Sequence, residues 1–213
     1  MRILFYGDSI TDAGRDRETT YEPASYGYGY VKNIVESLNA ENAEKYDLIN
    51  RGISGNRIVD LYARIKVDCW NFNPDVLSIL IGVNDIWHEI EGQNGVELDR
   101  FEKVYRMLIE DTLKKLPNVT ILLCEPFVLQ GEATVNDGNK WQRFLEVYEY
   151  AKVVKKLAEE YGLYFLPLQE QLSQAAQGGK EAEYLRDGVH PAPAGAKLIA
   201  EEWLQVFKTQ IEK

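Results

Sequence analysis

Residues 2–10 of the chain read Arg-Ile-Leu-Phe-Tyr-Gly-Asp-Ser-Ile, and this stretch indicates how the protein folds. The run Ile3–Tyr6 is short and entirely apolar, as is typical of a strand buried inside a sheet. Gly7, Asp8 and Ser9 follow it directly. Because open α/β sheets bind ligands at the carboxyl ends of their strands, we expect the Ser9 hydroxyl to lie at the ligand-binding edge of a sheet.

Four further apolar runs of strand length alternate with segments of helical periodicity. The runs are Leu48-Ile49, Val76–Ile81, Val119–Cys124 and Leu163–Leu166. Three apolar stripes at helical spacing are expected to face the core: Phe101, Val104, Tyr105 and Leu108; Phe144, Tyr148, Ala151 and Ala158; and Ile199, Trp203 and Val206. This alternation predicts an α/β fold with a parallel sheet covered by helices.

The composition limits the classes of protein and partner. With 213 residues and 45% hydrophobic content, the chain is predicted to form one domain over residues 1–213. It has 34 acidic and 24 basic residues and a formal charge of -10, which argues against nucleic acid and anionic membranes as partners and favours a neutral substrate. No run reaches the roughly 18 uninterrupted apolar residues that a membrane-spanning helix needs.

The start of the chain and its cysteines bear on location and metal binding. No apolar signal core precedes the first strand, so a cytoplasmic location is expected. Cys69 and Cys124 lack the short spacing of metal ligands and are predicted to be reduced thiols, and we expect no metal site.

Three polar clusters occupy the same structural phase as Ser9. Residues 50–56 and 81–85 follow predicted strands, and residues 187–191 precede the last helix. Because the loops at the carboxyl ends of parallel strands open on one rim, all four clusters are expected to meet at one cleft.

A base for Ser9 has to come from His88 or His190, the two histidines of the chain. Asp187 lies three residues before His190 in an Asp-Gly turn, close enough to hold the imidazole Nδ1 and leave Nε2 to take the serine proton. Read alone, this pair also fits a turn whose aspartate caps a helix. His88 has no comparable aspartate and is interpreted as a rim residue or a substrate contact.

An acyl-transfer site also needs donors for an oxyanion. The candidates are the backbone N–H groups of Ser9 and Gly55 and the side-chain amide of Asn84. Alternatively, Gly52 and Gly55 serve tight backbone geometry, and Asn84 with Asp85 caps a helix. Both interpretations can hold together, because a cap and an oxyanion donor occupy the same kind of loop.

Together the blocks at residues 7–9, 52–55, 82–85 and 187–190 resemble the SGNH or GDSL hydrolase superfamily, in order and over nearly the whole chain. The resemblance implies a flavodoxin-like three-layer α/β/α sandwich with a five-stranded parallel sheet in the order 2-1-3-4-5. It also implies the roles of the site residues: Ser9 as nucleophile, His190 as base, Asp187 as its partner, and Gly55 and Asn84 as oxyanion donors with the Ser9 N–H.

Longer matches at residues 7–15, 27–30, 50–56 and 81–87 are similar to bacterial carbohydrate acetylesterases of the xylan type. This resemblance implies removal of acetyl groups from a small acetylated saccharide through an acyl-enzyme, without a cofactor. A broader lipase, acylhydrolase or thioesterase acting on longer chains is the alternative. A non-catalytic saccharide-binding protein is a further one, against which the intact set of site residues argues.

Asp8, Trp87 and His88 are the candidate substrate-binding residues. Trp87 follows the Asn84 loop and fits a stacking platform for a sugar ring. Asp8 with Asp12 also suggests a Mg²⁺ site, although hydrogen bonding within the nucleophile loop is the favoured interpretation.

Ser54 is interpreted as structural, because it lacks the Gly-x-Ser-x-Gly elbow of α/β-hydrolases. The stretches 89–95 and 127–139 are predicted to be loops that set substrate choice. The aromatics Trp141, Tyr150 and Tyr184 allow either a homo-oligomer interface or core packing.

Overall fold

The computed structural model describes residues 1–135 and 138–212. Its strands form one parallel sheet in the order β2-β1-β3-β4-β5. They are β1 (Arg2–Gly7), β2 (Asp47–Asn50), β3 (Val76–Leu80), β4 (Thr120–Cys124) and β5 (Tyr164–Leu166). The five apolar runs are confirmed as strands, and so are the α/β fold and the strand order that the resemblance implied.

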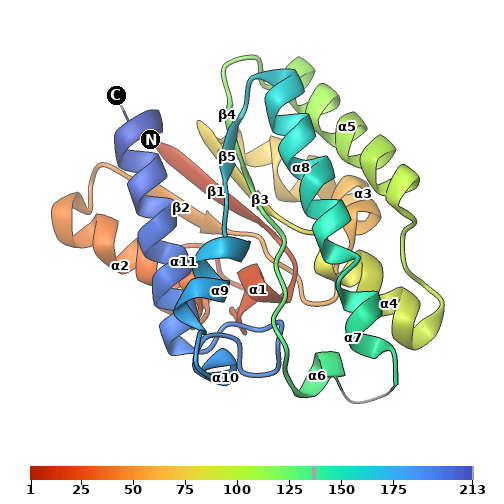
Figure 1. The fold of residues 1–213 in the computed structure, drawn as a ribbon. Coiled ribbons are helices and arrows are strands. Elements are labelled where there is room, and N and C mark those ends of the chain that lie inside the picture. The colour runs from red at the N-terminus through yellow and green to blue at the C-terminus, as the bar shows by residue number, and fades with distance from the viewer. Residues whose placement is uncertain (136–137, 213) are drawn as a thin grey trace.

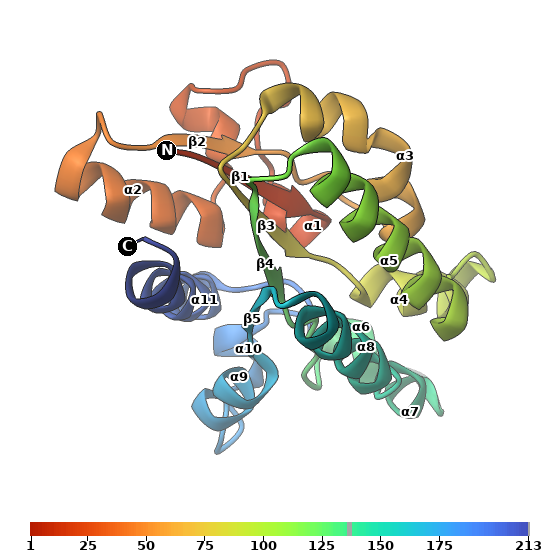
Figure 2. The same ribbon diagram turned by 90° about the horizontal axis from the view of Figure 1, so that it is seen from above.

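Helices cover both faces of this sheet and make three layers (Figure 1, Figure 2). On one face lie α2 (Tyr30–Asn42) and α11 (Pro193–Val206), and on the other lie α3 (Ile58–Asp68), α5 (Leu98–Lys115) and α8 (Val147–Tyr161). The shorter helices are α1 (Ser9–Asp12), α4 (Val83–Gly92), α6 (Glu132–Val135), α7 (Lys140–Phe144), α9 (Gln169–Ala175) and α10 (Glu181–Tyr184). In the described ranges, no helix is long and apolar enough to cross a membrane.

Strand β1 runs through the centre of the core, which explains its lack of polar alternation. Ile3–Tyr6 are fully buried, because helices pack on both faces of a parallel sheet. The Phe5 ring lies 5.2 Å from the ring of Trp203 on α11. The Trp203 indole N–H then donates to the Ser78 hydroxyl of β3 over 2.9 Å, which pairs a polar group that the core encloses.

Two local predictions need correction. Residues 144–158 were expected to lie on one helix, but α7 ends at Phe144 and α8 begins at Val147. Bonds from Glu146 to Arg143 and from Tyr148 to Leu145 tighten this junction to a three-residue turn, which rotates the face and leaves Tyr148 exposed. Val206 is only partly buried, because the next residue, Phe207, fills the core position instead.

The stretches predicted as loops are partly helical. The prediction is wrong for residues 89–92, which complete α4, and for residues 132–135, which form α6. Residues 136 and 137 of the second stretch lie outside the described residues.

The three aromatics proposed for an interface pack against the core. Tyr150 is 5% exposed and its hydroxyl donates to the Val96 carbonyl over 2.6 Å, while Trp141 and Tyr184 are partly buried. The homo-oligomer stays a prediction.

The order of the strands places a crevice beside Ser9. From β1 the chain leads to β2 on one side, and from β2 it crosses to β3 on the other side of β1. The loops that leave β1 and β3 therefore diverge, which opens the sheet's carboxyl edge at this point.

Candidate active site

The nucleophile candidate Ser9 is the first residue of α1, directly after β1. Asp8 caps this short helix, because its Oδ1 accepts the Ile10 N–H over 2.9 Å. The Ser9 Oγ lies 2.9 Å from His190 Nε2. The structure thus brings together two residues that are 181 positions apart in the sequence, at hydrogen-bond distance.

His190 is held by the turn that precedes α11. Its Nδ1 lies 2.6 Å from Asp187 Oδ2, and Asp187 Oδ1 accepts the backbone N–H groups of Val189 and His190 over 2.9 and 2.7 Å. Burial by itself would raise the pKa of Asp187, but these hydrogen bonds outweigh it and lower the pKa to about 2. An ionised Asp187 therefore fixes the imidazole with Nε2 facing Ser9.

The loop at residues 52–55 lies against α1 because Gly52 has no side chain. A Cβ there would clash with the backbone nitrogen of Asp12. Gly55 has φ +82°, a conformation that favours glycine. Across the parts of the chain that the structure describes, no hydrogen bond is donated by the Ser9 or Gly55 backbone N–H groups. Both are thus available to an oxyanion, and both residues line the same pocket.

Asn84 lies in the first turn of α4, is 4% exposed and lines the same pocket. One N–H of its side-chain amide donates to the Asn56 carbonyl over 3.1 Å, and the second N–H of the amide remains available to another acceptor. Its neighbour Asp85 caps a different helix, because Asp85 Oδ1 accepts the Ile58 N–H at the start of α3. The predicted capping role therefore belongs to Asp85, and the helix that it caps is α3, not its own helix α4.

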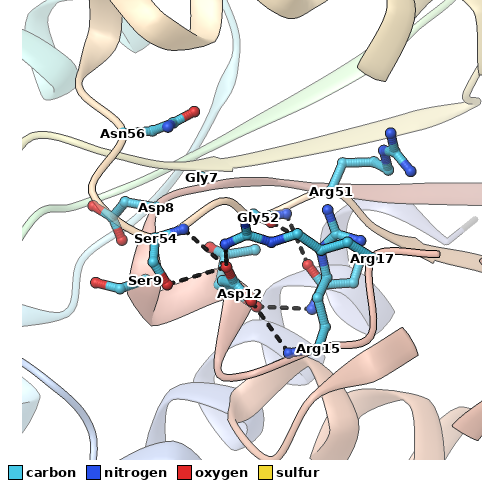
Figure 3. A network of polar contacts seen from close by, with 12 residues as sticks. Gly7, Asp8, Ser9, Asp12, Arg15, Arg17, Arg51, Gly52, Ser54 and Asn56 are labelled. Carbon is cyan, nitrogen blue, oxygen red and sulfur yellow. Dashed lines mark hydrogen bonds and ion pairs between the residues drawn. The ribbon is translucent and has the colours of Figure 1, made fainter. Parts of the chain in front are cut away.

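Ser54 and Asp12 join the oxyanion loop to the nucleophile helix (Figure 3). The Ser54 N–H and hydroxyl both donate to Asp12 Oδ2, over 2.8 and 3.0 Å. Arg17 pairs with the same oxygen, and the Arg15 N–H donates to Oδ1. These bonds agree with a structural role for Ser54 and engage the Asp12 carboxylate in the hydrogen bonding that the sequence favoured.

A pocket of about 370 Å³ opens beside Ser9 and His190. Its lining includes residues of every predicted cluster and of α4, and consists of Ser9, Ala13, Gly14, Tyr28, Ser54, Gly55, Asn84, Trp87, His88, Glu91, Arg186 and His190. Glu91 falls within the stretch 89–95 that the sequence predicted to set substrate choice, although not as a single candidate, and Arg186 was not predicted. Arg186 adjoins Asp187, a signal that could have found it, whereas Glu91 reaches the pocket only because α4 continues past His88.

The candidate substrate contacts differ in their exposure. Trp87 and His88 line the pocket. The Trp87 ring packs 5.7 Å from both His190 and Phe144, so it forms a wall behind the imidazole. Tyr28 is 60% exposed and offers a more open ring for stacking. Asp8 is 1% exposed and lies outside the pocket lining, so its burial does not fit a substrate contact.

The burial of Asp8 predicts a pH-dependent stability. Burial outweighs the Ile10 hydrogen bond and the charge of His190 and raises the pKa of Asp8 to about 7. A raised native-state pKa stabilises the fold at low pH, and this stability is lost as pH rises through about 7. We therefore expect Asp8→Asn to raise the melting temperature, relative to the wild type, more at pH 8 than at pH 5.

Thermal denaturation at the two pH values measures this difference. Asp99→Asn on the exposed face of α5 is the control and should shift both melting temperatures alike. A difference for Asp8→Asn that does not change with pH would contradict an ionisable Asp8 near neutrality.

Comparisons with known proteins agree with this geometry. The model of the GDSL-like lipase/acylhydrolase family matches residues 5–198. An acetylxylan esterase of Geobacillus stearothermophilus is 34% identical over 210 residues, which cover 96% of this chain and 92% of that protein.

Solved structures give the same picture. A crystal structure of a protein assigned as a GDSL-like lipase from Parabacteroides merdae superimposes with a TM-score of 0.89 at 39% identity, covering 97% of this chain and 95% of that one. The crystal structure of an acetylxylan esterase from Geobacillus stearothermophilus has a TM-score of 0.83 at 33% identity and covers 96% and 92% of the two chains.

Proposed function

The chain belongs to the GDSL-like lipase/acylhydrolase family and is a carboxylic ester hydrolase, and on this basis we propose that it removes acetyl groups from the hydroxyls of saccharides. The observation that carries the proposal is the series Ser9, His190 and Asp187, hydrogen-bonded at the wall of an open pocket. The similarity to an acetylxylan esterase over nearly the whole chain supports an acetylated saccharide as the substrate.

In the acylation step, Ser9 Oγ attacks the ester carbonyl carbon while His190 Nε2 takes the serine proton. The Asp187 carboxylate stabilises the imidazolium that forms. The carbonyl oxygen becomes an oxyanion, which the Ser9 and Gly55 N–H groups and the Asn84 amide bind. The bond to the sugar oxygen then breaks, His190 gives its proton to that oxygen, and the acetyl group stays on Ser9.

Deacylation repeats the same steps with water. His190 Nε2 takes a proton from a water molecule, which attacks the acetyl carbonyl carbon. The bond to Ser9 Oγ breaks, His190 returns the proton to the serine, and acetate leaves. The same three donors bind the oxyanion of this second intermediate.

The walls of the pocket support a short acyl group and a polar alcohol. Among the described residues, the apolar ones in the pocket lining are Ala13, Tyr28 and Trp87. A long acyl chain needs a more extended apolar surface than these side chains provide. Polar side chains from His88, Glu91 and Arg186 fit the hydroxyls of a saccharide instead.

Hydrolysis rates on p-nitrophenyl acetate and p-nitrophenyl octanoate test the acyl group. We expect kcat/KM at least about tenfold higher for the acetate ester, because the octanoate chain finds little apolar surface to bury. A preference for the octanoate ester contradicts the acetylesterase and supports a broader lipase or thioesterase.

Acetate release from acetylated xylo-, manno- and amino-sugar oligomers tests the saccharide, with Ser9→Ala as the matched inactive control. Cleavage of the p-nitrophenyl ester without acetate release from any of these oligomers would contradict a saccharide substrate and leave the esterase assignment in place.

A further inference from the structure

Arg64 on α3 lies outside the pocket, yet its guanidinium binds both loops that carry backbone oxyanion donors. Nη2 donates to the Gly7 carbonyl over 3.1 Å, and Nε donates to Asn56 Oδ1 over 2.7 Å. Gly7 is two residues before Ser9, and Asn56 directly follows Gly55. One planar group therefore bridges the nucleophile turn and the oxyanion loop.

The third donor is tied to the same group through Asn56. The main-chain carbonyl of Asn56 accepts the Asn84 amide over 3.1 Å, while its side chain accepts from Arg64. The Gly7 carbonyl also accepts the Ile53 N–H over 3.0 Å, so this oxygen holds the oxyanion loop as well as Arg64. The Ser9 N–H thus lies two residues from the Gly7 carbonyl that Arg64 binds, and the Gly55 N–H adjoins Asn56 (Figure 3 shows Gly7, Ser9 and Asn56). The third donor, the Asn84 amide, is bonded to Asn56 itself.

The guanidinium is itself held in place. Asp68, one helical turn further along α3, accepts from Nη1 over 3.0 Å, and the Arg51 carbonyl accepts from the same nitrogen over 2.9 Å. The guanidinium carbon lies 4.3 Å from the centre of the Tyr6 ring, and the side chain is only 15% exposed. Burial would raise the pKa of Asp68, but its hydrogen bonds to Arg51 and Arg64 lower this pKa instead. Asp68 therefore faces the Arg64 guanidinium as an ionised carboxylate.

We propose that Arg64 is a positioning residue, which aligns the three oxyanion donors with the Ser9 hydroxyl. This inference rests on the proposed function, because alignment matters only if these donors bind an oxyanion. Since Arg64 does not line the pocket, its loss leaves binding of the ground-state ester intact. It weakens binding of the tetrahedral state, and kcat falls while KM stays constant.

Arg64→Lys and Arg51→Lys form a matched pair for the test. Both arginines bind Asp68, and Arg51 does so from Nε over 3.1 Å while its guanidinium lies over the Phe72 ring. In the described part of the chain, the Arg51 side chain makes no hydrogen bond to the nucleophile or oxyanion loops. Lysine keeps the charge in both variants but cannot direct several donors in one plane.

We expect Arg64→Lys to lower kcat for p-nitrophenyl acetate by about 10- to 100-fold with KM within about twofold, as for a donor moved by a fraction of an ångström. Arg51→Lys should keep kcat within about threefold, because lysine keeps a positive charge beside Asp68 and the Arg51 side chain bonds to neither loop. Inhibition by ethylboronic acid, which forms a tetrahedral adduct on serine, should weaken for Arg64→Lys by a factor similar to the loss of kcat. Equal kcat for the two lysine variants, or unchanged boronate affinity in Arg64→Lys, would overturn the proposal.

Asn56→Ala decides the question if Arg64→Lys does not fold. It removes the Nε acceptor and keeps the backbone carbonyl that orients Asn84, so a lower kcat at constant KM supports the proposal and an unchanged kcat overturns it. Ser9→Ala separates this inference from the proposed function. A fully active Ser9→Ala refutes the catalytic roles. If Ser9→Ala is inactive while Arg64→Lys and Asn56→Ala both keep full activity, only the positioning role is refuted.

Discussion

Ser9→Ala is expected to lower kcat for ester hydrolysis by about 10⁴- to 10⁶-fold, the range seen when a serine hydrolase loses its nucleophile. The methyl group cannot form the acyl-enzyme, and His190 is left without the hydroxyl that it faces at 2.9 Å. The fold should persist, because α1 is held by the Asp8 cap, which does not involve the Ser9 hydroxyl. Initial rates on p-nitrophenyl acetate measure the loss.

Ser37→Ala on α2 is the control, since this serine lies on a helix away from the pocket and should leave kcat unchanged. Mass spectrometry of rapidly quenched wild-type enzyme should find one acetyl group on the peptide that contains Ser9. Ester hydrolysis that survives in Ser9→Ala at the wild-type rate would refute the mechanism.

Asp187→Asn is expected to lower kcat by about 10⁴-fold, as when the aspartate of a trypsin-type triad becomes asparagine. The amide oxygen of the substituted side chain can still accept the Val189 and His190 N–H groups, so the turn should keep its shape. The amide nitrogen, however, would face His190 Nδ1 and donate to it. The ring proton then moves to Nε2, which can no longer accept the proton of Ser9.

The pH dependence of stability provides a second measurement on this variant. The pKa of Asp187 is lowered to about 2, so its carboxylate stabilises the native state above its unfolded pKa, and this stability is lost as pH falls toward 2. Unfolding by urea should therefore show a smaller loss of stability between pH 6 and pH 3 for Asp187→Asn than for the wild type. For the activity measurement on Asp187→Asn, the control variant is Glu36→Gln on the surface of α2, which should match the wild type in kcat.

A kcat close to that of the wild type in Asp187→Asn would show that Asp187 does not orient the base. The same ionised state means that a fall in wild-type activity between pH 7 and pH 5 does not come from Asp187. Such a fall reports another group.

The sequence predicted those parts of the fold and the site that depend on neighbouring residues. The strand Ile3–Tyr6 could be recognised because the apolar run is too short for a helix and is bounded by Gly7 in a turn-like segment. Asp187 and His190 could be paired because three residues of a tight turn leave little freedom in their separation. The strand phase of Ser9 and Asn84 placed both at the same edge of the sheet.

Features that depend on packing between distant segments were not predictable in this way. The break between α7 and α8 has no glycine or proline to signal it, and the 144–158 stripe is periodic across it. Asp8 was a candidate substrate contact because of its neighbours in sequence, but its capping bond directs the carboxylate into the protein. Tyr28 and Tyr30 look alike in sequence, and only one is exposed.

Sequence by itself predicted the parallel α/β sheet and the five candidate site residues Ser9, Gly55, Asn84, Asp187 and His190, because periodicity and short motifs are local properties. Only the tertiary structure decided which of their neighbours face the pocket, and that Arg64 reaches Gly7 and Asn56 at once. Gly7 and Arg64 are 57 residues apart, and their contact exists because α3 packs against the sheet beside β1. No spacing along the chain encodes such a contact, since it depends on the combined packing of all the elements between them.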